Sequence, residues 1–270
     1  NKWLASGRVK IRHLKKSYAN DSTEKSTGAG GDPILGMEIF ESSKENIKSF
    51  VIDKDMIILW GAGGGGIGTP GMEICKNIAK ESSVPLFTIL ITPNSNEANK
   101  MVVAESLRLK MRDPGPLVVI QNSAATIEQR SVPLRELWHH INQESRGIFE
   151  AILQLTQSVG TSNADSRDLI TASNKGVDLY IGVYKSPEAE VENAFAAEAE
   201  LDKVVKEILN HPFQSHNMKA EAILSCYIGW NVNQIDYIEG KIVTNMNFPK
   251  DNGWIKKQVI DEVKRKSVFV

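Results

Sequence analysis

The sequence has 270 residues, of which 41% are hydrophobic, and a formal net charge of -1. This is enough to bury the core of one large or two modest domains, and the balanced charge excludes an electrostatic reason to bind nucleic acid or an anionic membrane directly. The two cysteines exclude a disulfide framework, and no apolar run approaches the ~20 residues that a membrane helix needs. We therefore expect a cytoplasmic protein with no membrane partner.

The first half of the chain alternates between helical and strand patterns. The predicted elements are a helix at 37–51, a strand at 56–60, a helix at 70–80, a strand at 84–92, a helix at 97–111 and a strand at 117–121. Such alternation is typical of an α/β fold with a mostly parallel, Rossmann-like sheet.

The second half begins with a long helical pattern at 132–159, which at ~1.5 Å per residue would span roughly 40 Å and could bridge two domains. A smaller α+β domain is predicted to follow. Its expected elements are a helix near 187–210 and strands at 220–228, 237–243 and 267–270. We therefore expect three parts: an α/β domain at 1–131, a central helix at 132–160 and a C-terminal domain at 161–270.

A glycine run from Gly61 to Thr69 lies between a predicted strand and a predicted helix. Glycine lets the backbone approach phosphate closely, and the start of a helix offers unpaired N–H groups, so this pattern favours a phosphate site. The spacing of Gly61, Gly63 and Gly66 also fits the dinucleotide fingerprint, although no acidic residue ends the next strand. A turn without a ligand is the third alternative, and a P-loop is excluded because no Gly-Lys-Ser/Thr follows.

Three segments together resemble the tubulin/FtsZ superfamily of GTPases, in the order that this superfamily uses. The segment Gly64 to Pro70 resembles its signature GGGTGTG, with Ile67 and Pro70 as departures, and Gly28 to Pro33 resembles its loop GAGANP. The segment Asn163 to Asp168 fits its carboxylate loop N-x-D-x-x-D. The superfamily's first strand and first phosphate loop would precede Asn1, so we expect residues upstream of this sequence.

The resemblance implies a GTP/GDP site made by this chain. The implied phosphate contacts are Gly28, Ala29, Gly30, Gly31, Gly63, Gly64, Gly65, Gly66, Gly68 and Thr69. Glu97 matches the ribose-binding glutamate, although an acid that stabilises the start of a helix is the alternative. Asn122 ends the strand that runs toward the guanine pocket, Trp138 matches a ring that packs on guanine, and Asn142 matches a residue that hydrogen-bonds the base edge. Since Trp138 and Asn142 are four residues apart, they share one helix face.

For hydrolysis, the resemblance implies that Asn163, Asp165 and Asp168 enter the nucleotide site of the next subunit. Carboxylates held near an attacking water can orient it and accept its proton. Mg²⁺, bound mainly through phosphate oxygens and water, would offset the negative charge, and no all-protein metal cage is expected. A turn and helix cap is the alternative for this segment.

Together these residues predict a GTPase that polymerises head to tail into filaments, because contacts between different surfaces of identical subunits need not close into a ring. DNA segregation or positioning is the first biological expectation, on a resemblance to plasmid and phage tubulins, with an adaptor protein that links filament to DNA. An FtsZ-like division filament is the second. The alternatives are a filament protein that binds nucleotide without hydrolysis and a dinucleotide-binding oxidoreductase.

Overall fold

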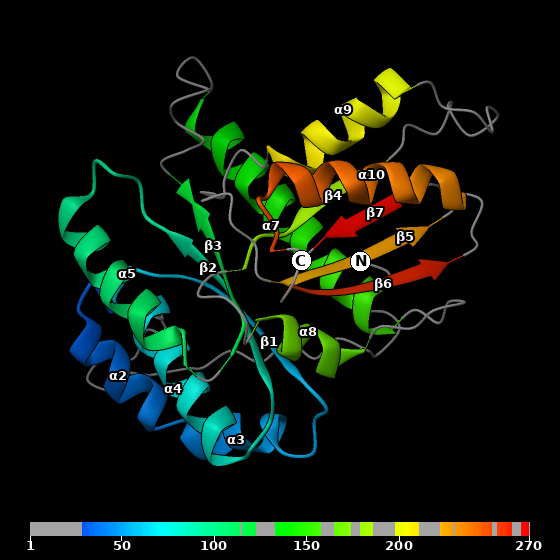
Figure 1. Cartoon of the computed structure of the whole chain (residues 1–270). Helices are drawn as coiled ribbons and strands as arrows, with labels where there is room; N and C mark the ends of the chain where they lie inside the picture. Colours follow the sequence, from blue (N-terminus) through cyan, green and yellow to red (C-terminus); the bar gives the residue numbers. More distant parts are fainter. Residues whose placement is uncertain are drawn as a thin grey trace, which may run out of the picture.

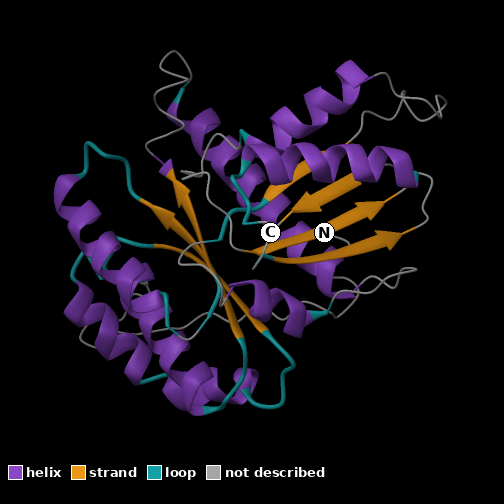
Figure 2. Ribbon diagram, viewed as in Figure 1, coloured by secondary structure: helices purple, strands orange, loops and turns teal. Residues whose placement is uncertain are grey.

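The structure is a computed structural model that describes residues 29–113, 115–122, 133–157, 165–173, 179–185, 198–210, 222–228, 230–249, 253–260 and 266–269. Figure 1 labels its elements, and Figure 2 shows a helix-covered sheet on each side of a central helix. Among the described helices, none is both long and apolar enough to cross a membrane.

The first sheet is parallel and has the strand order β1-β2-β3. Its strands are β1 (Ile57–Ala62), β2 (Leu86–Thr92) and β3 (Leu117–Gln121). Helices α4 (Gly68–Glu81) and α5 (Ala98–Met111) connect consecutive strands, and α2 (Pro33–Glu41) and α3 (Lys44–Val51) pack on α4. Since β2 lies between two partners, all but one of its residues are buried. The predicted α/β architecture is confirmed.

The second sheet is mixed and has the order β4-β7-β5-β6. Its strands are β4 (Gly182–Lys185), β5 (Ala222–Ile228), β6 (Trp254–Ile260) and β7 (Lys266–Phe269). The side chains of β5 alternate between two cores, as the period of a strand requires. Ile223 and Tyr227 pack with α9 (Glu198–Leu209) and α10 (Val232–Asn245), whereas Leu224 and Cys226 pack with α7 (Leu134–Gln157) and α8 (Ser166–Ser173).

Helix α7 lies between the two sheets and joins their cores (Figure 1). Its buried side chains recur at helical spacing and contact apolar residues of both sheets, and they include Leu137, Ile141, Ile148, Ile152 and Leu155. Its 24 residues correspond to a length of about 36 Å. The long central helix is therefore confirmed, while the exact domain boundaries that we expect remain predictions.

Several sequence-based expectations need correction. The single helix expected at 37–51 is two helices, and the first begins earlier, at Pro33, because the side chain of Asp32 accepts from the amides of Ile34 and Leu35. The strand expected at 237–243 is wrong: these residues belong to α10, which starts with a capping box between Asn231 and Gln234. The sequence reading also missed α8, β4 and β6.

Candidate functional site

Three loops gather at the end of the first sheet where β1 and β2 terminate. The glycine run connects β1 to α4, and the loop at 92–97 connects β2 to α5. A third loop, at 29–32, leads into α2, which packs on α4. We call these the glycine turn, the α5 loop and the α2 loop. Because parallel strands end at one edge of their sheet, the sequence places all three loops in one neighbourhood.

Close backbone contact holds the α2 loop against the glycine turn. A Cβ atom on Gly66 would lie 2.6 Å from the amide nitrogen of Asp32 and 2.7 Å from the carbonyl carbon of Gly31. A Cβ atom on Gly36 would overlap the carbonyl oxygen of Gly66. On the other side, Gly64 has a φ of 88°, and its Cβ would lie 2.7 Å from the carbonyl oxygen of Lys100. Glycine is therefore required sterically at several of these positions.

The glycine turn presents unused backbone donors. The amide of Gly64 donates to the Oγ1 of Thr69 at 2.9 Å, which closes the turn. The amides of Gly65, Gly66 and Ile67 donate no hydrogen bond to any described residue, and Ile67 caps α4 without a side-chain acceptor. Unpaired N–H groups at the start of a 14-residue helix are suited to binding an anion. The departures at Ile67 and Pro70 leave these donors in place.

The α2 loop has the same character. Gly30 and Gly31 have positive φ values of 60° and 89°, and both are exposed. Asp32 turns its carboxylate back to cap α2, where Oδ1 accepts from the amide of Ile34 at 2.8 Å. Ala29 is buried and Gly28 lies outside the described residues. This part of the predicted phosphate contact is thus presented by backbone rather than by a charged side chain.

Glu97 starts α5 and forms an ion pair with Lys100, one turn along the helix. The hydrogen bond from Lys100 is the main reason why the pKa of Glu97 lies below its ordinary value. Glu97 accordingly adopts the arrangement of a helix-start acid in this structure. Its side chain is 40% exposed, so it can still meet a ligand that approaches the α5 loop.

The residues predicted to hold a base come from β3 and α7. Asn122 follows β3, and its Oδ1 is buried with no hydrogen-bond partner among the described residues. Trp138 and Asn142 are exposed on one face of the first half of α7, and Trp138 is 55% exposed. A large exposed ring and an unsatisfied amide oxygen are both suited to a planar polar ligand.

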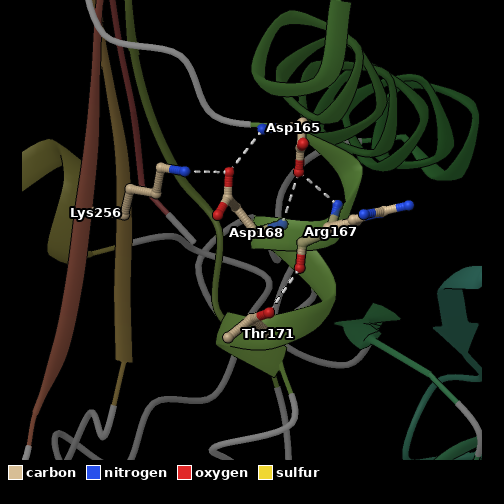
Figure 3. Close-up of polar contacts among 5 residues, drawn as sticks. All are labelled: Asp165, Arg167, Asp168, Thr171 and Lys256. Carbon is tan, nitrogen blue, oxygen red and sulfur yellow. Dashed lines mark hydrogen bonds and ion pairs between the residues drawn. The ribbon is translucent and has the colours of Figure 1, made fainter.

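The acidic segment is the start of α8 (Figure 3). The Oδ1 of Asp165 accepts from the amides of Arg167 at 2.8 Å and Asp168 at 3.1 Å. The Oδ2 of Asp168 accepts in return from the amide of Asp165 at 2.9 Å. This reciprocal arrangement is a capping box made of two aspartates, so the helix-cap alternative describes what these residues do within one copy. Asn163 lies outside the described residues.

The two carboxylates differ in exposure and in partners. Asp165 is exposed, whereas the side chain of Asp168 is only 18% exposed and forms an ion pair with Lys256 of β6 at 2.5 Å. The hydrogen bond from the amide of Asp168 is the main reason why the pKa of Asp165 lies below its ordinary value, and the amide of Arg167 and the charge of Lys256 act in the same direction. Asp165 therefore stays ionised at neutral pH.

We call Asp165 to Asp168 the acidic turn, and this turn and the glycine turn lie toward opposite ends of α7. Helix α7 runs from the end of the first sheet where β3 terminates toward the end where α8 lies (Figure 1). Helix α7 itself is about 36 Å long. The structure therefore does not bring the predicted catalytic acids to the predicted phosphate loops of the same chain.

The sequence reading missed Lys256 and had no signal for it, because its partner lies 88 residues earlier in the chain. It also missed the stacking of Trp60 on Phe149, with ring centroids 6.2 Å apart, which ties β1 to α7. Within the part of the chain that the structure describes, no group of three or more His, Cys, Asp or Glu residues could hold a metal ion.

No protein-family model matches the chain. Among curated proteins, the cell division protein FtsZ 2 of Halobacterium salinarum is 26% identical over 208 residues, which are 74% of this chain and 51% of the relative. The chain thus spans about half the length of this relative. Among solved structures, the FtsZ dimer of M. jannaschii superposes with a TM-score of 0.75 at 20% identity, over 90% of this chain and 71% of that one. A GTPγS-bound protofilament of CetZ2 from Haloferax volcanii gives a TM-score of 0.69 at 16% identity, over 90% and 73%.

The fold is that of FtsZ and CetZ, with a parallel sheet, glycine turns at its carboxyl edge and a central helix that leads to a second sheet. The sequence similarity to FtsZ proteins covers three quarters of the chain. In sequence and in fold, the chain is thus similar to FtsZ and CetZ proteins of the tubulin/FtsZ superfamily.

Proposed function

We propose that this protein binds GTP and hydrolyses it at the joint between two copies that assemble head to tail. The observation that carries the proposal is the distance between the two candidate half-sites in one copy. Phosphate-type loops lie at one end of α7 and an exposed acidic turn lies at the other. A second copy stacked along this direction would bring its acidic turn to the loops of the first. Such a contact is heterologous and extends into a filament.

In the proposed pocket, backbone amides contact the phosphates. The unused donors of Gly65, Gly66 and Ile67 lie at the positive end of α4, and Gly30 and Gly31 approach from the α2 loop. Hydrogen bonds from such groups to charged oxygens are stronger than those to neutral acceptors. Ala29, Gly63, Gly64, Gly68 and Thr69 complete or shape the same turns, and Gly28, which lies outside the described residues, stays a predicted phosphate contact.

At the other end of the ligand, the unsatisfied Oδ1 of Asn122 accepts from the amino edge of guanine, and Trp138 packs on the ring with Asn142 beside it. Glu97 reaches the ribose either by leaving Lys100 or while still paired with it. At its Watson–Crick edge guanine has donors at both N1 and the 2-amino group, whereas adenine has an acceptor at N1, so the amide oxygen of Asn122, which can only accept, favours guanine.

Hydrolysis uses the acidic turn of the adjacent copy. The ionised Asp165 orients the attacking water and accepts its proton, while Asn163 and Asp168 support it. Mg²⁺ would offset the negative charge of the phosphates. Phosphate oxygens and water would hold the ion, because the described residues offer no cluster of metal ligands. Bringing carboxylates to GTP only in the filament makes hydrolysis depend on assembly.

Light scattering and phosphate release, followed together, test the proposal. GTP and a slowly hydrolysed analogue should both produce polymer, GDP should not, and phosphate should appear only after scattering rises. Mixing Trp138→Ala copies, which bind GTP weakly, with Asp165→Asn copies, which bind GTP but lack the acid, should restore hydrolysis that neither shows alone. No recovery in assembled mixtures would exclude a site shared between copies.

The biological role is a division-type filament or a DNA-segregating filament. The curated relatives with sequence similarity are described as cell division proteins, which supports the first role. The resemblance to plasmid and phage tubulins, and the DNA adaptor it implies, rests on the sequence motifs. A fluorescent fusion distinguishes them, since a ring at the division site supports the first role and movement with a plasmid or phage genome supports the second.

A further inference from the structure

The two aspartates of the acidic turn are not equivalent, and a lysine from the far end of the sequence accounts for the difference. Lys256 lies on β6, at the edge of the second sheet, and its Nζ is 2.5 Å from the Oδ2 of Asp168. The same oxygen accepts from the amide of Asp165 at 2.9 Å. One carboxylate oxygen of Asp168 thus joins the sheet to the residue at which the acidic turn begins (Figure 3).

This linkage fixes the direction of Asp165. The Oδ1 of Asp165 accepts from two amides of the first turn of α8, so the carboxylate has a defined orientation. Its Oδ2 accepts no hydrogen bond from a described residue, and the side chain is exposed. Asp168, in contrast, is mostly buried against Lys256, which is itself 36% exposed. An ion pair screened from water in this way constrains geometry more strongly than one on an open surface.

We propose that Lys256 is a positioning residue for hydrolysis, which acts through Asp168 to hold the free oxygen of Asp165 toward the adjacent copy. Asp165 is then the carboxylate that contacts the attacking water, and Asp168 stays in its own copy as part of the support. This inference rests on the proposed GTPase function and assigns different roles to the two acids that the sequence motif treats alike.

The test compares Lys256→Met with Lys256→Arg in the full-length protein, at GTP concentrations that separate kcat from KM. Lys256→Met should lower kcat per assembled copy roughly 10- to 100-fold through misplacement of the acid. KM for GTP should not change, because the phosphate loops belong to the other copy. Lys256→Arg keeps the charge and should restore most of the rate. The control is Lys257→Met, whose side chain pairs with Glu239 on the opposite face of β6.

A double-substitution cycle identifies the route of the effect. If Lys256 acts through Asp168, adding Lys256→Met to Asp168→Asn should produce no further loss of kcat. If the loss of kcat in the double variant equals the product of the losses in the two single variants, the proposal is overturned. A wild-type kcat in Lys256→Met, or no recovery of kcat in Lys256→Arg, would also overturn it.

Amide hydrogen exchange in the unassembled, nucleotide-free protein separates this inference from the proposed function. Lys256→Met should speed exchange of the amides of Asp165 and Asp168, and Lys257→Met should not. Unchanged exchange would overturn the positioning role. If the wild type fails to hydrolyse GTP, the GTPase function falls and the catalytic part of this inference falls with it, while faster exchange would still establish that Lys256 orders the acidic turn.

Discussion

The glycine turn and the acidic turn differ in which part of the chain carries their chemistry. In the proposed site the glycine turn acts through backbone amides, and its residues are constrained by the close contacts that an added Cβ atom would make. The acidic turn acts through side chains, and its geometry is fixed by hydrogen bonds and by an ion pair with a distant strand. Substitution should therefore affect the first through steric exclusion and the second through lost charge and direction.

The largest effect on GTP binding is expected at Gly66, where the α2 loop and the glycine turn meet. Gly66→Ala places a Cβ 2.6 Å from the amide nitrogen of Asp32 and must push the two loops apart. Losing two oriented donors to phosphate should weaken GTP binding on the order of 100-fold, as measured by calorimetry. Gly65→Ala is the matched control for folding, since its Cβ meets nothing within 4 Å and its thermal unfolding should be unchanged. Wild-type GTP affinity in Gly66→Ala would contradict the proposed phosphate site.

The largest effect on hydrolysis, as distinct from binding, is expected at Asp165, because its substitution leaves the phosphate loops unchanged. Asp165→Asn retains a cap acceptor but removes the proton acceptor, so phosphate release should fall by about 10²- to 10⁴-fold. GTP affinity should stay at the wild-type value, and the polymers should persist longer in light scattering. Asp113→Asn, at an exposed acid paired with Lys80, serves as the control. Unchanged turnover in Asp165→Asn would remove Asp165 from the mechanism.

The contrast between these turns also explains what could be read from the sequence. The glycine turn was predictable because the strand, the glycines and the helix are consecutive in the sequence. Since close backbone contacts leave no room for side chains in this turn, the sequence there consists mostly of glycine. The sequence also predicted the acidic segment, but not that Asp168 pairs with Lys256, because nothing local relates residues 88 positions apart. The strand expected at 237–243 failed for a related reason: β-branched Ile238, Ile242 and Val243 suit a strand locally, while the cap at Asn231 and packing against α9 select a helix.

A smaller effect follows from the protonation of Asp165, whose folded pKa lies below its ordinary value. The stability that this carboxylate adds is therefore present above the unfolded pKa of about 3.9 and is lost as pH falls through the lower folded pKa. The start of α8 should keep its cap throughout the neutral and mildly acidic range and fray only below about pH 4. NMR titration checks this pH dependence: the chemical shifts of the Arg167 and Asp168 amides should change with pH in the wild type, and this transition should be absent in Asp165→Asn. A midpoint near neutral pH would contradict the assignment of an ionised cap.

The smallest effect concerns α7, which joins the two regions. Gly147 lies in the interior of this helix, and a Cβ there would meet nothing within 4 Å. Gly147→Ala should therefore stabilise the protein by about 0.5–1 kcal/mol, because alanine loses less backbone entropy in a helix, and should raise the unfolding temperature by about 2 °C. If α7 is a rigid spacer that sets the distance between the turns, GTP turnover in the filament should stay at the wild-type rate. A more stable protein with slower turnover would instead indicate that α7 bends at Gly147 while the two turns are brought together.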